Sequence, residues 1–395
     1  MKKILVINSG SSSIKFQLIR IPGQIVQASG LVERIGLDNS AIHYKSKKMN
    51  IADEVPIPNH EDGLKRIAKL LMDSERGAVN DMKEIDAVGH RVVHGGKEFA
   101  DTIVIDGKVK NAIKELFPLA PLHNPHNYTG IEVAESVFPD AIQVAVFDTA
   151  FHQTLPEKAY KYAVPNKFLD EDNIRVYGFH GTSHRYVAEK ALDFISRKES
   201  KLITIHLGNG CSITAVKNGK SIDHSLGFAP VNGLIMGTRS GDIDQSIIFY
   251  MVKTLGYSLE EVSELLHKKS GMLGLTGYSD LREIEEQAEK GNKECQLALV
   301  MNAYRIKKYI GAYAAALNGV DALVFTAGIG ENSSVLRRLV CEDMDYLGIE
   351  LEDYKNNVRS TENRIISKET SKVMVLVIPT NEELEIAKQT YELIS

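Results

Sequence analysis

Histidine and arginine are the residues whose types and settings point most directly to chemistry. Nine of the twelve histidines fall between His90 and His224, mostly in turn-like settings beside glycine or proline. A metal site is disfavoured, because no His-Glu-x-x-His motif occurs and the flanking residues do not hold ligands on one helix face. Arg91 and Arg239 accompany them, and both side-chain types donate hydrogen bonds to phosphoryl oxygens. The pattern favours an anion pocket, with about half of these histidines structural.

Two glycine- and serine-rich turns offer a second anion-binding feature. Residues 8–13 follow the apolar run 4–7, and residues 208–212 follow the apolar run 202–205. Close backbone approach and convergent N–H groups suit a phosphate, and Lys15 adds a positive charge after the first turn. Each turn taken alone is more simply a plain hairpin. Neither is a Walker A loop or a Rossmann fingerprint, because the motif residues are missing and each strand leads to another strand.

A third glycine-rich segment, residues 326–332, follows an apolar run and opens a helix that Asn332 or Ser333 caps. A helix N-terminus is a site for a phosphate or for a nucleoside packed against backbone. The simpler alternative is a tight strand-to-helix turn. Asp280 begins another helix, where it either favours the helix dipole or reaches a ribose hydroxyl.

Two carboxylates come near the ends of apolar runs. Asp148 follows one run directly, and Glu382 follows another after three intervening residues. Ligands bind at the carboxyl ends of strands in open α/β sheets. Asp148 is either a solvated turn residue, an acid/base group or an orienting group. The segment around Glu382 matches a capping box in which Glu383 reaches back to Thr380, which leaves Glu382 to hold Mg²⁺ through water.

Together these features are the components of ATP-dependent phosphoryl transfer. They comprise two phosphate hairpins, a nucleoside-type loop, arginine and histidine anion binders, and carboxylates for a metal. Positioning and charge neutralisation do most of the catalysis in such sites. The sequence therefore predicts an ATP-dependent kinase.

The elements that position these residues alternate along the chain. Five short apolar runs, typical of strands buried on both faces, are separated by helical patterns. The apolar runs are residues 4–7, 142–147, 202–205, 322–325 and 373–378. The helical patterns are residues 130–137, 183–196, 258–267, 280–290 and 332–340. The alternation predicts an α/β fold with layered sheets. Residues 34–59 are the most irregular stretch.

A plan of strand, glycine-rich turn and alternating strand occurs twice. The two copies begin at Ile4 and Leu202, 198 residues apart, which is about half of the chain. Two hairpins can both be rich in glycine by chance. Their half-chain spacing nevertheless favours a duplication into two like-folded halves.

Composition excludes several classes of protein. The 395 residues are 43% hydrophobic and 25% charged, with a formal net charge of −5, which argues against disorder and against general nucleic-acid binding. No apolar run approaches the roughly 20 residues of a membrane helix, and the N-terminal run is too short for a signal peptide. The three cysteines form no Cys-x-x-Cys pair and favour a reducing compartment. We expect two or three domains in a soluble, cytoplasmic protein without nucleic-acid or membrane partners.

Eight motifs, spread over essentially the whole chain, carry a family resemblance. They are Asn8-Ser9-Gly10-Ser11-Ser12-Ser13-Ile14-Lys15, Gly89-His90-Arg91-Val92-Val93-His94-Gly95-Gly96, Phe147-Asp148-Thr149-Ala150-Phe151-His152, residues 178–184, residues 206–210, Gly237-Thr238-Arg239-Ser240-Gly241-Asp242, residues 328–332 and residues 379–383. With them the sequence resembles the acetate kinase family, of the acetate and sugar kinase, Hsp70 and actin superfamily. The resemblance implies two duplicated actin-like (ribonuclease H-like) α/β domains flanking a nucleotide cleft. We expect an N-terminal acyl-kinase domain of residues 1–149 plus 383–395, and a C-terminal nucleotide-binding and dimerisation domain of residues 150–382.

The resemblance also implies catalytic roles. Asn8 and Glu382 look like the family's magnesium-site residues, with Mn²⁺ as a substitute for Mg²⁺. Arg91 looks like the residue that binds the substrate carboxylate and phosphoryl group, and Asp148 resembles the acid/base position. Because Glu382 must then meet Asn8, we expect the last helix to return to the first domain.

Further residues resemble the family's stabilising and binding groups. His180 and Arg239 look like its transition-state stabilisers, and His123 lies in the same pocket. The residues that match its ATP-contacting segments are Lys15, His206, Leu207, Gly208, Asn209, Gly210, Asp280, Leu281, Arg282, Gly328, Ile329, Gly330, Glu331 and Asn332. The residues that match its apolar pocket for the acyl methyl group are Val93, Leu122, Phe179 and Pro230.

The implied reaction is reversible, in-line phosphoryl transfer from Mg-ATP to acetate, which gives acetyl phosphate and ADP. Relatives that prefer propionate tend to carry a smaller residue where Val93 stands, which favours acetate here. One methylene discriminates by only about 1–3 kcal/mol, so propionate or another short-chain acid stays an alternative. The resemblance also implies a homodimer.

Other enzyme and binding classes fit less well. A sugar kinase would not need the Arg91 and Arg239 anion clamps, and an Hsp70-like chaperone needs an appended peptide-binding domain. A dinucleotide-dependent oxidoreductase is disfavoured by the missing Gly-x-Gly-x-x-Gly motif. The chain departs from the family pattern around Val231 and Asn232, at Gln245 and at His126, but none of these departures removes a catalytic group.

Overall fold

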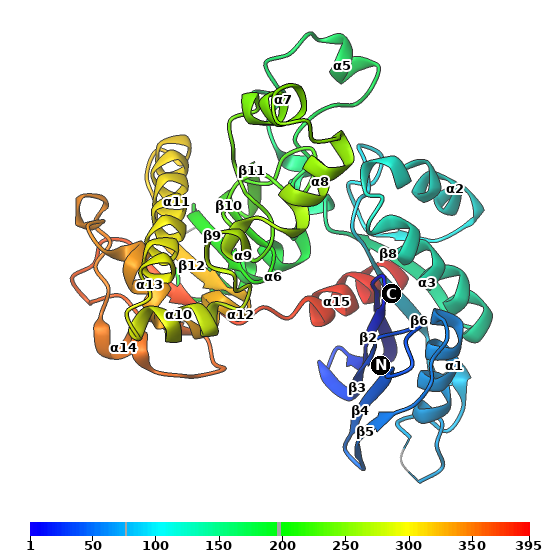
Figure 1. Cartoon of the computed structure of the whole chain (residues 1–395). Helices are drawn as coiled ribbons and strands as arrows, with labels where there is room; N and C mark the ends of the chain where they lie inside the picture. Colours follow the sequence, from blue (N-terminus) through cyan, green and yellow to red (C-terminus); the bar gives the residue numbers. More distant parts are fainter. Residues whose placement is uncertain (76, 196–198) are drawn as a thin grey trace. The chain divides into compact units, whose positions relative to one another are not determined.

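The computed structural model describes residues 1–75, 77–195 and 199–395. The chain divides into two compact units, of which unit 1 comprises residues 1–151 and 381–395, and unit 2 comprises residues 152–380. The chain therefore leaves unit 1 after residue 151 and returns to it after residue 380, where the sequence led us to expect 149 and 382. In Figure 1, which is coloured along the sequence, unit 1 includes both the blue beginning and the red end of the chain.

Unit 1 is built on an eight-stranded sheet of order β5-β4-β3-β2-β1-β6-β8-β7. Strand β1 pairs antiparallel with β2 and parallel with β6, and β6 pairs parallel with β8. The strands are β1 (Lys2–Ser9), β2 (Ser13–Ile21), β3 (Ile25–Glu33), β4 (Ala41–Ser46), β5 (Asn50–Glu54), β6 (Ala87–Val92), β7 (Ile103–Val104) and β8 (Ile142–Phe147). The carboxyl ends of β1, β6 and β8 therefore meet at one edge of the sheet.

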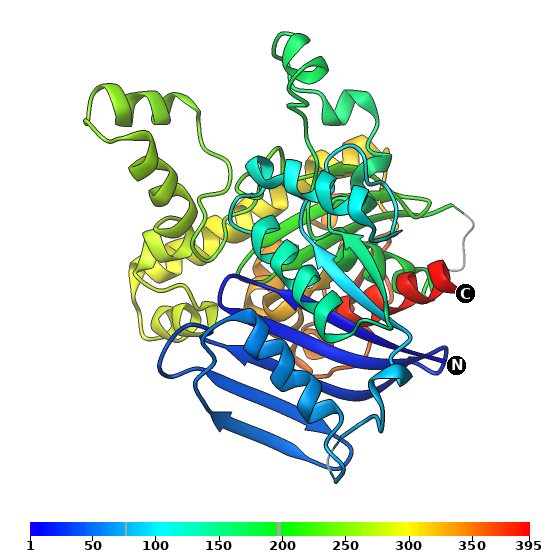
Figure 2. The same ribbon diagram turned by 90° about the vertical axis from the view of Figure 1, so that its right-hand side faces the viewer.

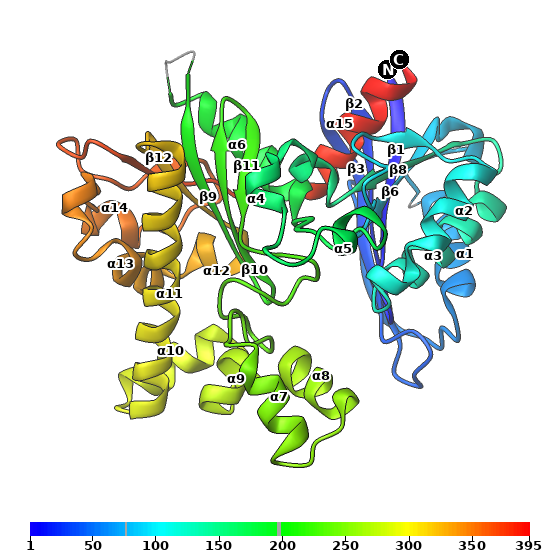
Figure 3. The same cartoon turned by 90° about the horizontal axis from the view of Figure 1, so that it is seen from above.

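Helices cover both faces of this sheet. They are α1 (His60–Leu71), α2 (Gly107–Glu115), α3 (Asn124–Val137) and α15 (Glu382–Ile394). Figure 3 shows α1, α2 and α3 on one side of the sheet and α15 on the other. One core joins buried residues of the strands to α1, among them Leu5, Phe16, Tyr44 and Leu64. Burial on both faces explains why the central strands are continuous apolar runs rather than alternating ones.

The C-terminal helix α15 packs against β1, β2 and β6. A Cβ atom at Gly89 in β6 would lie 2.6 Å from Oγ1 of Thr390 and 2.9 Å from Cγ2 of Ile386, so only glycine permits this approach. Nζ of Lys2 donates a hydrogen bond of 2.7 Å to the carbonyl of Ile394. The two ends of the chain consequently lie side by side in unit 1 (Figure 2).

Unit 2 contains a six-stranded sheet of order β11-β10-β9-β12-β14-β13. Its strands are β9 (Lys201–Leu207), β10 (Cys211–Lys217), β11 (Lys220–His224), β12 (Ala322–Thr326), β13 (Arg364–Ile365) and β14 (Met374–Val377). The series β11-β10-β9-β12-β14 repeats the series β3-β2-β1-β6-β8 of unit 1, with the same parallel and antiparallel pairs. The predicted duplication is therefore present in the topology.

Helices also cover the sheet of unit 2, and Figure 3 shows α6 and α11 on opposite sides of it. The helices of unit 2 are α4 (Glu157–Tyr160), α5 (Lys167–Asp170), α6 (Gly181–Leu192), α7 (Ser246–Lys253), α8 (Leu259–Lys268), α9 (Gly271–Thr276), α10 (Leu281–Glu289), α11 (Lys293–Leu317), α12 (Ala327–Asn332), α13 (Ser334–Cys341) and α14 (Asp353–Asn357). Both units also contain short 3-10 helices. In unit 1 these are η1 (Met82–Glu84) and η2 (Phe117–Leu119), in unit 2 η4 (Asp345–Leu347), and η3 (Ala150–Thr154) spans the division between the units.

All five predicted strands are found, and each predicted helical pattern overlaps an observed helix. The pattern 183–196 ends as helix α6 at Leu192, and its last residue, Ser196, lies outside the described residues. Residues 34–59 are not irregular throughout, because β4 and β5 form an antiparallel hairpin there. The 25-residue helix α11 was not predicted. No helix in the described ranges has the length and apolar character needed to cross a membrane.

Candidate active site

Arg91 and Asp148 meet at the carboxyl edge of the unit 1 sheet. Arg91 lies near the end of β6, and Asp148 directly follows the neighbouring parallel strand β8. Nε of Arg91 donates to both carboxylate oxygens of Asp148 at 3.2 and 3.1 Å, and Nη2 donates to Oδ2 at 2.5 Å. Asp148 is only 1% exposed. It is therefore not a solvated turn residue, and its carboxylate fixes the orientation of the guanidinium.

Glu382, the first residue of α15, joins this group, with Oε2 lying 3.8 Å from Nε of Arg91. Desolvation raises the pKa of Glu382, although the positive charge of Arg91 opposes the shift. The pKa of Arg91 is raised, because Asp148 and Glu382 outweigh the lowering effect of its own burial. The guanidinium therefore stays charged and faces two carboxyl groups.

Asn8 and Lys15 lie opposite each other in the register of β1 and β2. Nζ of Lys15 pairs with Oε1 of Glu383 at 2.5 Å. The predicted capping box is wrong, because Asn381 caps α15 by accepting from the backbone N–H of Leu384, and Glu383 pairs with Lys15 instead. The end of β1 and the start of α15 thus bring amide, ammonium and carboxylate groups to the same edge.

The donor chemistry of Asn8 and Glu382 suits Mg²⁺, which prefers carboxylate and amide oxygens. No cluster of three or more histidine, cysteine, aspartate or glutamate residues that could hold a metal occurs in the described part of the chain. Mg²⁺ commonly takes one or two carboxylates and completes its shell with water and substrate phosphates. A pair of oxygen donors therefore fits a metal that arrives with its nucleotide.

Two of the predicted acyl-pocket residues lie in unit 1. Val93 is buried, whereas Leu122 is 54% exposed and His123 follows it at the N-cap position of α3. Asn127 of α3 accepts a hydrogen bond of 3.0 Å from the backbone N–H of Val93 and donates one of 2.8 Å to the carbonyl of Ser9. Asn127 therefore ties the position of Val93 to the end of β1, a role that the sequence analysis missed.

His180 and Arg239 approach each other in unit 2. A Cβ atom at Gly210 would lie 3.3 Å from Nε2 of His180 and 3.3 Å from Nη2 of Arg239, so both side chains reach this glycine closely. His180 has a left-handed backbone, with φ of 56° and ψ of 26°, where it begins α6. Such a conformation costs about 1–3 kcal/mol in a non-glycine residue and is typical of functional sites.

The other two residues predicted for the acyl pocket, Pro230 and Phe179, lie next to Arg239 and His180 in unit 2. Nη1 of Arg239 donates a hydrogen bond of 2.6 Å to the carbonyl of Pro230. Phe179, which precedes His180, is 1% exposed, and its backbone N–H donates to Nε2 of His224 at 3.1 Å. Burial lowers the pKa of Arg239. Among the described residues Arg239 pairs with no carboxylate, in contrast to Arg91, and bonds a neutral carbonyl.

A cavity of about 720 Å³ in unit 2 brings the three predicted ATP-contacting segments together. It is lined by Gly208, Asn209, Ser279, Asp280, Leu281, Arg282, Glu285, Gly328, Ile329, Asn332, Ser333 and Arg359. His206, Leu207, Gly210, Gly330 and Glu331 are not among its described lining residues. Oε1 of Glu331 instead accepts a hydrogen bond of 3.2 Å from the backbone N–H of Thr380.

Asp280 lies at the start of α10 and at the wall of this cavity. It caps α10 by accepting from the backbone N–H of Arg282, and it lines the cavity. Hydrogen bonds from the side chain and backbone of Arg282 lower the pKa of Asp280 to about 2, so the carboxylate is ionised. Ser333 caps α13 as predicted, and its hydroxyl also donates to Glu285 at the cavity wall.

Arg337 supports this cavity from the interior. It is 1% exposed, and its Nη1 donates to the carbonyls of Gly330 and Glu331 at 2.9 and 3.0 Å. Its Nε donates to Oδ1 of Asn356 at 2.8 Å. Burial lowers the pKa of Arg337, but only to about 10, so the guanidinium is charged near neutral pH. Residues 330 and 331 of the glycine-rich segment therefore accept hydrogen bonds from a buried cation.

Comparison with known proteins decides among the kinase classes. The family model described as the acetokinase family matches residues 3–388. The chain belongs to the acetokinase family. It is therefore an enzyme, and its class is that of the phosphotransferases.

Individual members of the acetokinase family match over the full length. The chain is 62% identical over 392 residues to the acetate kinase of Flavobacterium johnsoniae, with 99% of each chain covered. The crystal structure of Porphyromonas gingivalis acetate kinase matches with a TM-score of 0.94 and 45% identity over 100% of both chains. A propionate kinase from Francisella tularensis matches with a TM-score of 0.93 and 41% identity, covering 98% of this chain and 99% of that one.

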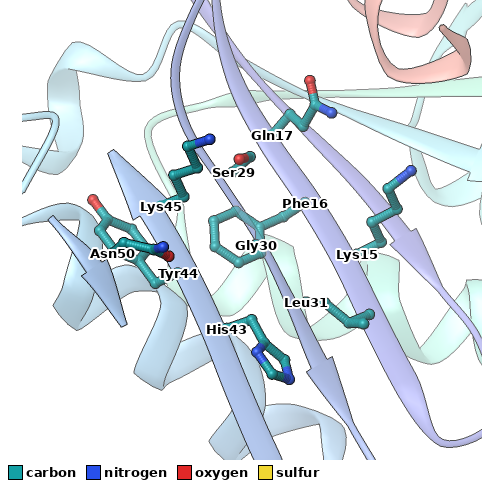
Figure 4. A pocket seen from close by; sticks show the side chains of 10 residues that line it. All are labelled: Lys15, Phe16, Gln17, Ser29, Gly30, Leu31, His43, Tyr44, Lys45 and Asn50. Carbon is teal, nitrogen blue, oxygen red and sulfur yellow. The ribbon is translucent and has the colours of Figure 1, made fainter. Parts of the chain in front are cut away.

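One further cavity of this acetokinase-family chain, of about 510 Å³, lies on the open face of β2, β3 and β4 in unit 1 (Figure 4). It contains Lys15 but no other predicted site residue. Lys15, Gln17, Leu31, His43 and Lys45 extend from that face. The cavity therefore neighbours the carboxyl edge through Lys15 without being part of the predicted site.

Some site residues could not be found from the sequence. Glu285 and Arg359 line the cavity of about 720 Å³, and Arg337 supports it, yet each stands alone in its segment without a motif. The residues at which the chain departs from the family pattern are not among those that line or support this cavity. Gln245 holds the N-cap position of α7, and the ring of His126 stacks on that of His60, with 6.3 Å between centroids.

Proposed function

We propose that this acetokinase-family enzyme phosphorylates acetate with ATP, giving acetyl phosphate and ADP in a reversible reaction. The observation that carries the proposal is the meeting of His180 and Arg239 at Gly210 in unit 2. Gly208 and Asn209, which precede Gly210, line the nucleotide cavity. Two hydrogen-bond donors therefore stand next to the place where a nucleotide's phosphates would extend from that cavity.

In the proposed reaction a carboxylate oxygen of acetate attacks the γ-phosphorus of ATP. The new bond joins that oxygen to phosphorus, and the bond between phosphorus and the β–γ bridging oxygen breaks, so that ADP leaves with the electron pair. His180 and Arg239 donate to the equatorial oxygens as charge develops on them. His123 is assigned to the same group by the family resemblance.

Arg91 is proposed to bind the carboxylate of acetate. Its charge and its fixed orientation against Asp148 support this role. Acetate is already deprotonated at neutral pH, because an ordinary carboxyl group has a pKa of about 4. No base is needed to create the nucleophile, so Asp148 acts by orienting Arg91.

Asn8 and Glu382 are proposed to hold the Mg²⁺ that accompanies ATP, and Mn²⁺ has the same preference for oxygen ligands. Bound there, the metal ion would neutralise negative charge on the phosphates. The raised pKa of Glu382 in the absence of a metal supports this role, because a desolvated carboxylate gains most from a cation beside it.

Acetate is proposed as the preferred acyl substrate, with Val93, Leu122, Phe179 and Pro230 contacting its methyl group. The backbone of Val93 is held by Asn127 and its side chain is buried, which supports a fixed apolar position for it. A propionate kinase among the similar structures keeps the alternative substrate open. The two acids differ by one methylene, for which about 1–3 kcal/mol of discrimination is available.

The test is a hydroxamate assay with ATP and Mg²⁺, in which acetate, propionate, butyrate and glycerol are compared at equal concentrations. We expect acetyl hydroxamate to form fastest, propionyl hydroxamate more slowly, and glycerol to give no product in a coupled ADP assay. ADP formation with glycerol but not with acetate would overturn the proposal. A higher kcat/KM for propionate would change the preferred substrate and leave the reaction class intact.

A homodimer is also proposed, formed through unit 2. Helix α7 is rich in apolar residues, yet none of its eight residues, all of them described, is buried. Phe249 and Tyr250 of α7 are 60% and 57% exposed, and Leu297 and Tyr304 of α11 are 59% and 64% exposed. Exposed apolar residues that gather in patches mark interfaces between proteins. Cytoplasmic localisation is proposed because the three cysteines are all buried thiols.

A further inference from the structure

Behind His180 lies a chain of hydrogen bonds that the proposed reaction does not use. Oγ of Ser212 lies 2.8 Å from Nδ1 of His180 and 2.7 Å from Nε2 of His184. Nδ1 of His184 lies 2.7 Å from Oγ1 of Thr204. Ser212, His184 and Thr204 are all 0% exposed. A continuous path of polar atoms therefore connects Thr204 in β9 to the ring that begins α6.

The hydrogens in this path can be arranged in only two ways. Burial, with smaller contributions from His152 and His206, holds the pKa of His184 well below 6.5, so its ring is neutral and has one N–H. Ser212 has one hydroxyl hydrogen and faces two ring nitrogens, so it donates to one and accepts from the other. The path therefore runs either from Thr204 toward His180 or from His180 toward Thr204.

The buried end of the path distinguishes the two directions. Among the described residues, the hydroxyl of Thr204 has one hydrogen-bond partner, Nδ1 of His184. If the path ran toward Thr204, this hydroxyl would accept, and its own hydrogen would be left without an acceptor in a site with no exposure. A buried unsatisfied donor costs about 1–3 kcal/mol. If the path runs from Thr204, every hydrogen along it has an acceptor.

The geometry points to Thr204, His184 and Ser212 as positioning residues that keep the hydrogen of a neutral His180 on Nε2. Thr204 donates to Nδ1 of His184, Nε2 of His184 donates to Ser212, and Ser212 donates to Nδ1 of His180. A neutral imidazole whose Nδ1 accepts must carry its hydrogen on Nε2. The inference rests on the proposed function only for the use to which that hydrogen is put.

Nε2 of His180 lies on the side of Gly210 and Arg239, where the proposed function places the phosphoryl group. A Cβ atom at Gly210 would lie 3.3 Å from this nitrogen and 3.3 Å from Nη2 of Arg239. An Nε2–H therefore adds a second donor beside the guanidinium, whereas a bare Nε2 would present a lone pair to a negatively charged oxygen. The tautomer of one ring decides whether His180 attracts or repels the phosphoryl group.

The test reads the tautomer directly. In protein labelled with ¹⁵N-histidine, two-bond ¹H–¹⁵N correlation spectra at mildly alkaline pH distinguish Nε2–H from Nδ1–H rings, and the spectrum of His180→Asn identifies the signals of His180. We expect wild-type His180 to be in the Nε2–H form. Ser212→Ala should give a mixture of tautomers and lower kcat about tenfold to a hundredfold, with the KM for ATP changed by less than about twofold.

Matched variants separate this role from a general loss of packing. Ser221→Ala breaks a similar buried bond, because Oγ of Ser221 lies 2.8 Å from Nδ1 of His152, and it should leave the tautomer of His180 unchanged. Thr204→Val removes the first hydroxyl from the path while keeping the strand, and should also mix the tautomers, whereas Thr204→Ser should restore them. This pair replaces Ser212→Ala if that variant fails to fold.

Two results would overturn the inference. One is a wild-type His180 in the Nδ1–H form, and the other is a Ser212→Ala enzyme whose His180 tautomer is unchanged. The proposed function fails in a different way. If His180→Asn keeps the wild-type kcat, His180 is not a stabilising group, and the spectra still decide the direction of the hydrogen bonds.

Discussion

Arg91 donates three hydrogen bonds to the carboxylate of Asp148, which is almost completely buried. Asp148→Asn keeps the shape and removes the charge, so Arg91 loses its orientation. We expect the KM for acetate to rise about tenfold and the free energy of unfolding to fall by about 1–3 kcal/mol. Steady-state kinetics and denaturant unfolding measure both. Glu189→Gln, in the exposed pair with Arg185, should change neither, and an equal effect there would contradict the role of Asp148.

Arg239→Ala removes the guanidinium at Gly210 without removing the nucleotide cavity. We expect kcat to fall by about a thousandfold, while the KM for ATP changes much less, because the lost contact is made mainly in the transition state. Arg185→Ala, on the exposed side of α6, is the control and should behave as wild type. A kcat close to that of wild type in Arg239→Ala would remove this residue from the mechanism.

Arg337→Met removes the buried cation that supports residues 330 and 331. The carbonyls of Gly330, Glu331 and Asn356 then each lose a donor, and each buried carbonyl left unsatisfied costs about 1–3 kcal/mol. We expect a lower Tm and a KM for ATP raised about tenfold, with the KM for acetate little changed. Arg338→Met, the exposed neighbour in the same helix, is the matched control and should leave both values unchanged. Calorimetry and initial rates compare the two variants.

Buried histidines predict acid sensitivity. Burial lowers the pKa of His90, His94 and His152 to about 4 from the ordinary 6.5, so between these values the unfolded chain binds protons that the folded chain does not. Stability is therefore complete above about pH 6.5 and falls toward pH 4, by up to about 1.4 kcal/mol per pH unit for each histidine. Unfolding of His90→Asn should depend less steeply on pH, whereas exposed His43→Asn should keep the wild-type slope.

The exposed apolar residues of α7 predict a monomeric variant. Phe249→Asp places a charge in the proposed interface, where desolvating it is costly. We expect sedimentation equilibrium to give twice the mass of one chain for the wild type and a large monomer fraction for the variant. The control is Tyr354→Asp, which changes an aromatic residue of α14 that is 80% exposed. It tests whether a charge at any exposed aromatic residue dissociates the dimer, and we expect this variant to stay dimeric. A wild-type monomer would contradict the proposal.

The elements best predicted from the sequence were those buried on both faces. Continuous apolar runs such as residues 142–147 coincide with strands because helices cover each side. Helix α11 was missed for the opposite reason. Its inner face is buried, but its outer face also carries apolar residues, Leu297, Val300 and Tyr304, so the helical period is blurred. The hairpin of β4 and β5 was missed because β5 has no buried residue to mark it.

The site shows a similar division. Asp148 and Asp280 could be singled out as candidates because they directly follow or begin elements whose ends the sequence marks. Arg337 was missed because an arginine in an amphipathic helix is normally exposed, and only the packing of α13 against α14 makes it a buried donor. Thr380 was assigned as a cap, but a cap depends on local backbone angles, and Asn381 next to it has the same chemistry.

The hydrogen bond between Lys2 and Ile394 has a consequence for how the chain is made. Unit 1 starts synthesis first, but it lacks α15 until residues 382–394 are added, and by then all of unit 2 has been translated. Unit 1, whose synthesis begins first, is thus completed after unit 2. A chain that stops before Glu382 would have the sheet of unit 1 without the helix that packs against β1, β2 and β6.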